Sequence, residues 1–321
     1  MLRRLLLSAT FGFFAFAHGW AGAQTYPARP VHVIVGFAAG GPTDILARLT
    51  GERLSRLWGQ PVVVENRPGA GGLIALDVVR RAPADGLVFG VLNLNQIVAE
   101  ELLPKPTFDI QKELVAVSGL AQQGNVLVVN PAIPAKTPSE LIAYLKAHPA
   151  MANYASGGNG SPAHLAGELF KTQAGVQMTH VAYKGAAPAL QDVVSGQVNL
   201  MFAAAPPALP LVKAGKLRAL AVTSAKRMAQ FPDLPTLAES GISVDVLDWQ
   251  GFVVPRGTPA AVVSKINADL LKVMAAPDFR ERVGSLGGET AGGTPSEFAA
   301  HIAAETRKWR KVIKESGITA N

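Results

Sequence analysis

Two glycine-rich turns contain the residues of this chain that could do chemistry. Residues 36–44 read Gly-Phe-Ala-Ala-Gly-Gly-Pro-Thr-Asp, and residues 156–162 read Ser-Gly-Gly-Asn-Gly-Ser-Pro. Each turn follows an apolar run and precedes a helical pattern. Such a turn leaves backbone N–H groups unpaired at the positive end of a helix, where a carboxylate or phosphate can bind. The pair predicts a chain that grips a small anion from two sides.

Known phosphate-binding motifs do not describe these turns. The first turn has no Lys after its glycines, so it is not a Walker A loop, and its spacing is not G-x-G-x-x-G. We therefore expect no nucleotide cofactor. A glycine-rich turn can also be a plain connection between a strand and a helix, and we favour this structural role for a third turn at residues 66–72.

Ser161 and His164 could form a nucleophile and its base. They stand three residues apart at the start of a helical pattern, but their surroundings do not make a G-x-S-x-G elbow. Ser161 is better explained as a helix N-cap. His164 could donate to a bound anion or simply cap and pack, and both interpretations stay open. A secreted hydrolase or transferase using these two residues is the alternative function.

Composition excludes several other classes. The chain has 321 residues, a formal net charge of +7 and no cysteine. It therefore has no disulfide, thiol nucleophile or thiolate metal site. The basic residues are dispersed and do not form a nucleic-acid footprint. The histidines show no spacing suited to metal ligation, so we expect no metal.

The N-terminal residues predict export. Arg3 and Arg4 precede an apolar stretch at residues 5–17, and Ala21-Gly22-Ala23 gives a small-x-small cleavage pattern. We expect residues 1–23 to be a signal peptide and the mature protein to reside in the periplasm.

Strand and helix patterns alternate along most of the chain, which predicts an α/β fold with largely parallel sheets. Asp44, Ser161 and Thr294 stand where N-caps belong. The C-terminal helix should pack onto the body. The expected strands are 31–35, 62–65, 87–92, 126–129, 179–183, 198–202, 219–223 and 251–254. The expected helices are 44–58, 72–82, 138–147, 162–174, 186–195, 259–275 and 295–315.

Six segments together make the chain resemble the Bug family, the extracytoplasmic solute-binding receptors of tripartite tricarboxylate transporters. Each segment is weak alone, but their order across the chain is specific. They are Val-Gly-Phe-Ala-Ala-Gly-Gly-Pro-Thr-Asp at 35–44, Glu-Asn-Arg-Pro-Gly-Ala-Gly-Gly at 65–72, Tyr-Ala-Ser-Gly at 154–157, His-Val-Ala-Tyr-Lys-Gly at 180–185, Lys-Ala-Gly-Lys-Leu-Arg at 213–218 and Pro-Arg-Gly-Thr-Pro at 255–259.

The resemblance implies a two-lobed periplasmic binding protein of the type II-like kind, with a sheet flanked by helices in each lobe and two hinge crossings. Lobe one would comprise residues 24–122 plus 224–321, and lobe two residues 123–223. The crossings would lie near residues 122–125 and 222–225. A ligand in the cleft between the lobes would favour the closed state.

The resemblance also implies which residues hold the ligand. Backbone N–H groups of the two glycine-rich turns would bind its carboxylate. Lys184 is the one cation near a motif, although a solvated lysine in a turn explains it equally well. The implied ligand-binding residues are Phe37, Ala39, Gly40, Gly41 and Asp44 from lobe one, and Ser156, Asn159, Gly160, Ser161, His164, Lys184, Gly185 and Ala204 from lobe two.

One departure from the family pattern concerns residues 203–206. Many relatives carry a polar or acidic pair there, whereas this chain has Ala-Ala-Ala-Pro. An ammonium group would lose a partner, so we expect a carboxylate without a free amine, such as a dicarboxylate or an aromatic acid. The expected partners are the membrane subunits of a tripartite tricarboxylate transporter or a sensor kinase, with the receptor as a monomer that is not an enzyme.

Overall fold

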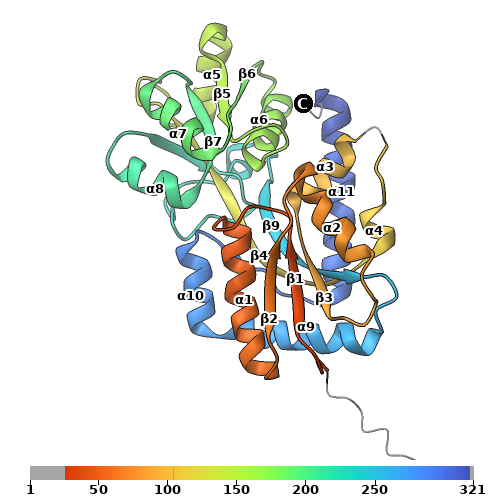
Figure 1. The fold of residues 1–321 in the computed structure, drawn as a ribbon. Coiled ribbons are helices and arrows are strands. Elements are labelled where there is room, and N and C mark those ends of the chain that lie inside the picture. Colours follow the sequence, from red (N-terminus) through yellow and green to blue (C-terminus); the bar gives the residue numbers. More distant parts are fainter. Residues whose placement is uncertain (1–25, 104, 319–321) are drawn as a thin grey trace, which may run out of the picture.

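The computed structural model describes residues 26–103 and 105–318 (Figure 1). The predicted signal peptide lies outside these residues. The strands are β1 (Val31–Val35), β2 (Val62–Asn66), β3 (Val88–Asn93), β4 (Leu114–Val129), β5 (Asn153–Ser156), β6 (Thr179–Ala182), β7 (Leu200–Ala204), β8 (Arg218–Val222), β9 (Leu247–Pro255) and β10 (Glu289–Thr290). The α-helices are α1 (Pro42–Trp58), α2 (Leu73–Arg80), α3 (Leu94–Leu102), α4 (Ile110–Glu113), α5 (Pro138–Ala147), α6 (Pro162–Ala174), α7 (Ala186–Ser195), α8 (Ala205–Lys213), α9 (Ala260–Ala275), α10 (Pro277–Ser285) and α11 (Pro295–Ser316). Short 3-10 turns are η1 (Ala70–Gly72), η2 (Pro149–Met151) and η3 (Ala238–Ser240).

The strands fall into two groups that share β4. The order is β2-β1-β3-β9-β4-β7-β5-β6, with β8 and β10 also paired to β4. Pairs within β1–β3 and within β5–β7 are parallel, whereas every pair that includes β4 or β9 is antiparallel. The predicted α/β fold is therefore confirmed, but the sheets are mixed, because β4 and β9 run against their neighbours.

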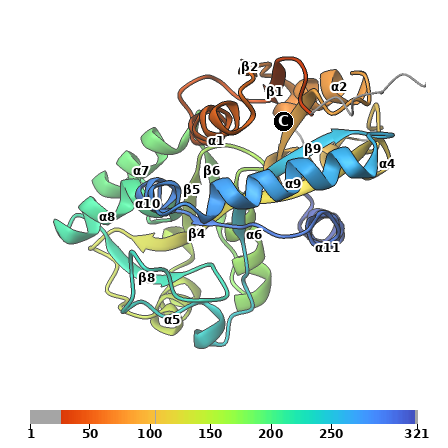
Figure 2. The same ribbon diagram turned by 90° about the horizontal axis from the view of Figure 1, so that it is seen from below.

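The helices cover both faces of the β2-β1-β3-β9-β4 group. Apolar side chains of α1, α9 and α10 form one core against β1, β3 and β9. On the other face, α2, α3 and α11 pack into a core that continues into the second strand group. Figures 1 and 2 show α9 and α11 as two separate helices beside the sheet, and each contributes to a different one of the two cores.

The C-terminal helix packs onto the body as predicted. Trp309 of α11 is fully buried. The Glu305 carboxylate accepts hydrogen bonds from the indole N–H of Trp309 at 2.9 Å and of Trp249 at 3.1 Å. Because Trp249 lies in β9, this carboxylate joins α11 to one of the strands that run toward the second group.

The partners of β4 change in the middle of the strand. Residues up to Gly124 pair with β9, and residues from Asn125 onward pair with β7, while β8 joins from Val126. The Thr223 N–H donates to the Asn125 carbonyl at 2.8 Å, and the Val246 N–H to the Thr223 carbonyl at 3.2 Å. The division into lobes at residues 122/123 and 223/224 stays a prediction.

Several elements differ from the sequence-based expectation. Helices α3, α8 and α10 were not expected. Of the residues of β4, the sequence predicted only the last four as a strand. Asp44 is not an N-cap: α1 begins at Pro42 with Gly41 as its N-cap. The caps at Ser161 and Thr294 are confirmed, because each side chain accepts a backbone N–H in the first turn of its helix.

Replacing Gly167 of α6 by Ala tests the packing of this helix. A Cβ at Gly167 would overlap the ring of Tyr154 in β5, so Gly167→Ala should destabilise the protein by about 1–3 kcal/mol. Gly284→Ala in α10 is the matched control, because a Cβ there meets nothing within 4 Å. The control should stabilise by about 0.5–1 kcal/mol through helix propensity. Urea unfolding measures both, and a stabilised Gly167→Ala variant would contradict the packing.

Candidate functional site

The first glycine-rich loop, Gly36–Gly41, connects β1 to α1 and is held by Asp44. The buried Asp44 carboxylate accepts the Gly40 N–H at 2.8 Å, the Asn66 amide at 2.9 Å and the Arg48 guanidinium at 3.0 Å. Asn66 also donates to the Phe37 carbonyl at 3.0 Å. The geometry gives Asp44 the role of shaping this loop.

The same bonds fix the charge of Asp44. Burial raises the pKa of this carboxyl, but the hydrogen bonds from Arg48, Gly40 and Asn66 outweigh burial and leave the pKa below its usual value. The Gly40 N–H donates to Asp44 and is not available to a ligand. The N–H groups that remain without an intrahelical acceptor belong to the first turn of α1, which includes Thr43.

The second glycine-rich loop, Gly157–Gly160, connects β5 to α6 and uses the same device. The Gly160 N–H donates to His164 Nδ1 at 3.0 Å. Ser161 caps α6 by accepting the His164 N–H at 3.4 Å, and its hydroxyl donates to the Gly158 carbonyl at 2.7 Å. The Ser161 hydroxyl and the His164 ring are thus bonded to the backbone, not to each other.

Three rings stack behind the second loop. The His164 and His180 rings lie 4.0 Å apart, and the Tyr154 ring lies 4.9 Å from that of His180. His180 Nε2 is 2.6 Å from the hydroxyl of the fully buried Ser156. Because Ser156 is fully buried, its contact with His180 lies behind the loop and supports it. Sequence reasoning missed it, although Tyr154 and His180 are register partners on neighbouring parallel strands.

The environment of the stack lowers the basicity of both imidazoles. Burial and then the neighbouring His180 lower the pKa of His164 to about 4, and burial also lowers the pKa of His180. His164 is therefore neutral at pH 7. With Nδ1 accepting from Gly160, the ring proton of His164 is on Nε2.

The second loop rests on the first strand group through α3. A Cβ at Gly160 would lie 3.3 Å from Val98 and 3.6 Å from Leu102, which share one face of α3. Asn95 belongs to that face by helical spacing, and its Oδ1 is buried with no hydrogen-bond partner among the described residues. Figure 1 shows α6 next to α3. It also shows the connection between β1 and α1 on the side of the first strand group that faces β5, β6 and β7.

The remaining predicted residues lie around these loops. The Gly185 N–H donates to the Gly157 carbonyl at 3.2 Å, so the turn at 183–185 packs on the second loop. Lys184 and Asn159 are exposed. Ala204 ends β7 opposite Asn125 of β4, and the buried Asn125 Nδ2 has no hydrogen-bond partner in the described chain. Participation of any of these residues in ligand binding stays a prediction.

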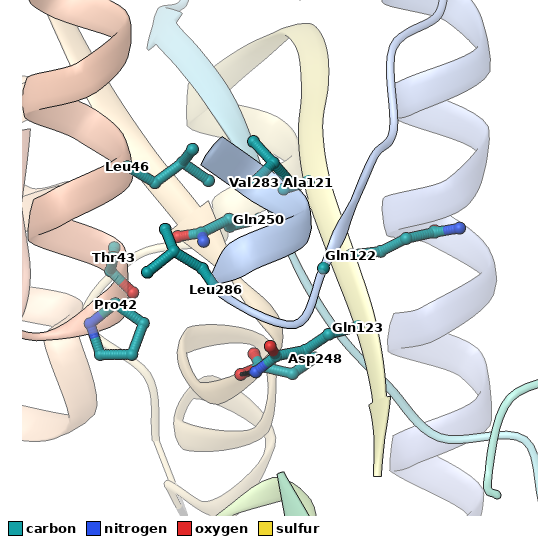
Figure 3. Close-up of a pocket in the computed structure, with 11 residues that line it drawn as sticks. Pro42, Thr43, Leu46, Ala121, Gln122, Gln123, Asp248, Gln250, Val283 and Leu286 are labelled. Atoms are coloured by element: carbon teal, nitrogen blue, oxygen red, sulfur yellow. Dashed lines mark hydrogen bonds between the residues drawn. The ribbon is translucent and has the colours of Figure 1, made fainter. Parts of the chain in front are cut away.

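A pocket opens beside the first loop, between α1, α10 and the middle of β4 and β9 (Figure 3). Asp248 and Gln123 lie side by side in it, with the Gln123 amide 3.3 Å from the Asp248 carboxylate. Burial raises the pKa of Asp248 to about 6, although the Gln123 hydrogen bond opposes this shift. The lining residues are Pro42, Thr43, Leu46, Ala121, Gln122, Gln123, Asp248, Gln250, Val283, Leu286 and Gly288.

Residues 26–103 and 105–318 contain no group of three or more His, Asp or Glu side chains placed to hold a metal ion. Within the same ranges, no helix combines the length and apolar character of a membrane span.

Comparisons with known proteins agree with one another. The family model described as "Tripartite tricarboxylate transporter family receptor" matches residues 46–318. Protein BugT of Bordetella pertussis is 35% identical over 317 residues, which cover 97% of each chain. R. palustris Rpa4515, solved with adipate, is 37% identical with a TM-score of 0.78 and covers 92% of this chain and 99% of its own. MatC from Rhodopseudomonas palustris, solved with bound malate, is 33% identical with a TM-score of 0.74, and the match covers 90% of this chain and 100% of MatC.

Acid should destabilise the protein through His164. Its pKa is about 4 in the folded chain against 6.5 ordinarily, so between these values the unfolded chain binds a proton that the folded chain does not. The contribution of His164 is therefore complete above pH 6.5 and decreases as the pH falls toward 4, by about 2–3 kcal/mol. Urea midpoints between pH 7 and pH 4 measure this loss.

The control is His164→Asn, whose Oδ1 can accept the Gly160 N–H but does not titrate. The variant should lose less stability over this pH range than the wild type. Other groups that titrate there, including Asp248 and His180, are present in both proteins. Equal losses would show that His164 is not the acid-sensitive group.

Proposed function

Because this chain belongs to the Bug family of tripartite tricarboxylate transporter receptors, we propose that it is a periplasmic receptor that captures a small organic carboxylate between two lobes. The similarity covers nearly the whole chain, so the proposal concerns a complete receptor fold. In this proposal the protein binds and releases its ligand without turnover.

The observation that carries the proposal is the matched construction of the two loops. Each loop contains a positive-φ glycine, Gly40 at 81° or Gly160 at 73°, whose N–H is bonded to the third residue of the following helix. In both helices the first residue is a proline. The Thr43 N–H of α1 has no intrahelical acceptor, and in α6, where Ser161 caps the His164 N–H, the Ala163 N–H has none. A carboxylate is the small anion that such helix starts stabilise through hydrogen bonds and the helix dipole.

Ligand capture would couple to a hinge motion. The proposed lobes are residues 24–122 plus 224–321 and residues 123–223, as expected from the family. A ligand that contacts both loops binds only the closed arrangement fully, and it shifts the population toward closure by that difference in affinity. The partner change of β4 at Gly124 and Asn125 supports a hinge there.

The relatives and the backbone N–H groups of the loops support the proposed ligand class. The solved relatives hold adipate and malate, both dicarboxylates. We propose a dicarboxylate or an aromatic acid for this chain, delivered by a monomer to transporter subunits or presented to a sensor kinase. Backbone amides bind an anion without a permanent countercharge, which favours release to such a partner.

Replacing Gly40 by Ala tests the role of the first loop. The positive φ of Gly40 makes Ala unfavourable by about 1–2 kcal/mol, and relief of this strain should reshape the loop. We expect affinity for adipate or malate, measured by calorimetry, to fall about tenfold or more. A thermal-shift screen with mono- and dicarboxylates, and with aspartate and glutamate as amine-bearing controls, selects the ligand first.

The matched control is Gly59→Ala. Gly59 has a φ of 63°, and a Cβ meets nothing within 4 Å at either position. Gly59 follows the far end of α1, so its variant should lose similar thermal stability and keep full affinity. Equal affinity for the two variants would place the ligand away from the first loop. Binding of no organic acid, or conversion of one to a product, would refute the receptor.

A further inference from the structure

The pocket of Figure 3, here called the side pocket, adjoins the first loop. Pro42 and Thr43, which begin α1 directly after this loop, line one wall. On the opposite side, a Cβ at Gly287 would overlap Pro206 at the start of α8, so the second strand group touches the rim. The side pocket is therefore continuous with the region where the two groups meet.

The part of the side pocket beside Leu46, Val283 and Leu286 is apolar except for the Gln250 amide. Leu46 and Val283 are buried in its walls, and Figure 3 shows the Gln250 side chain between Leu46 and Leu286. Gln250 Oε1 is buried and has no hydrogen-bond partner among the described residues. An unpaired buried amide oxygen is costly, so this atom favours a ligand group that completes its hydrogen bonding.

Asp248 sets the charge that this region accepts. Its carboxylate lies with Gln123 in the same pocket, two residues before Gln250 in β9. The described lining residues include no Lys, Arg or His that would neutralise a second negative charge. An ionised carboxylate entering the pocket would meet Asp248 without a compensating cation, which disfavours it.

We propose that the side pocket is a specificity subsite that accepts the far end of the ligand when this end carries a neutral hydroxyl group. A hydroxyl group both donates and accepts a hydrogen bond. It can therefore pair with Gln250 whether the oxygen or the nitrogen of this amide faces the ligand. The methylene or aromatic carbons behind it contact Leu46, Val283 and Leu286. This inference rests on the proposed function, because it takes the ligand carboxylate to lie at the first loop. Within that function it favours a hydroxy acid, including a hydroxylated aromatic acid, over the dicarboxylate also proposed above.

The dimensions of α1 set the length of such a ligand. Leu46 lies four residues beyond Pro42 in α1, or about one helical turn of 5.4 Å. A ligand that spans this depth has several carbon atoms between its carboxylate and its hydroxyl. A short hydroxy acid such as malate would leave the Gln250 amide unpaired.

Calorimetry at pH 8, where Asp248 is ionised, tests the subsite with four acids of equal chain length: hexanoate, 6-hydroxyhexanoate, adipate and 6-aminohexanoate. The wild type should bind 6-hydroxyhexanoate about tenfold more tightly than hexanoate, which corresponds to one hydrogen bond. Adipate should bind more weakly than the hydroxy acid, because its second carboxylate would lie near the ionised Asp248. The ammonium of 6-aminohexanoate can pair with Asp248, so its affinity should fall in Asp248→Asn.

Two variants assign the effect to the pocket. Gln250→Leu should bring the ratio of hydroxyhexanoate to hexanoate affinity close to one, and Asp248→Asn should improve adipate binding several-fold. Gln191→Leu, on the exposed side of α7, is the control and should leave all four affinities unchanged. Each ratio is measured within one variant, so a change in overall stability does not imitate the result.

Three outcomes would overturn the subsite while leaving the receptor intact. They are equal binding of hexanoate and 6-hydroxyhexanoate by the wild type, tighter binding of adipate than of 6-hydroxyhexanoate, and an unchanged ratio in Gln250→Leu. If none of the four acids binds while another carboxylate does, the subsite is also wrong. If no carboxylate binds at all, the proposed function fails and the subsite fails with it.

Discussion

Each glycine-rich loop keeps its shape because the third residue of the next helix accepts the N–H of a glycine four positions earlier. Asp44 does this for Gly40, and His164 does it for Gly160. The bond fixes each loop against the start of its helix. Both strand groups use this device, although the sequences of the two loops differ.

The two acceptors differ in what maintains them. Asp44 is an ion held by Arg48 and Asn66, and its acceptor state persists over a wide pH range. His164 accepts only while it is neutral, and its burial against His180 keeps it so. The second loop therefore depends on a dry stack of Tyr154, His180 and His164, whereas the first depends on a network of charges.

The region between the strand groups is rich in neutral amides. Asn95, Asn125 and Gln250 each bury one amide atom that has no hydrogen-bond partner in the described chain. Neutral amides cost less to bury than charges and can orient a ligand by geometry.

The sequence by itself determined the local features: the α/β class, the strand-to-helix position of both loops, the caps at Ser161 and Thr294, and the family. These follow from short-range periodicity and from turn chemistry. The sequence could not reveal that Asp44 shapes its loop, that His164 stacks on His180, or that Gln250 and Asp248 share a pocket with Leu46. The Asp44 contact with Gly40 is local, but Asn66 of β2 helps to hold this carboxylate. The pairing of β5 with β6 brings His180 to His164, and the packing of α1 against the sheet brings Leu46 to Gln250 and Asp248. The helices α8 and α10 were missed for a related reason: prolines and glycines obscure their pattern, and packing against the body stabilises them.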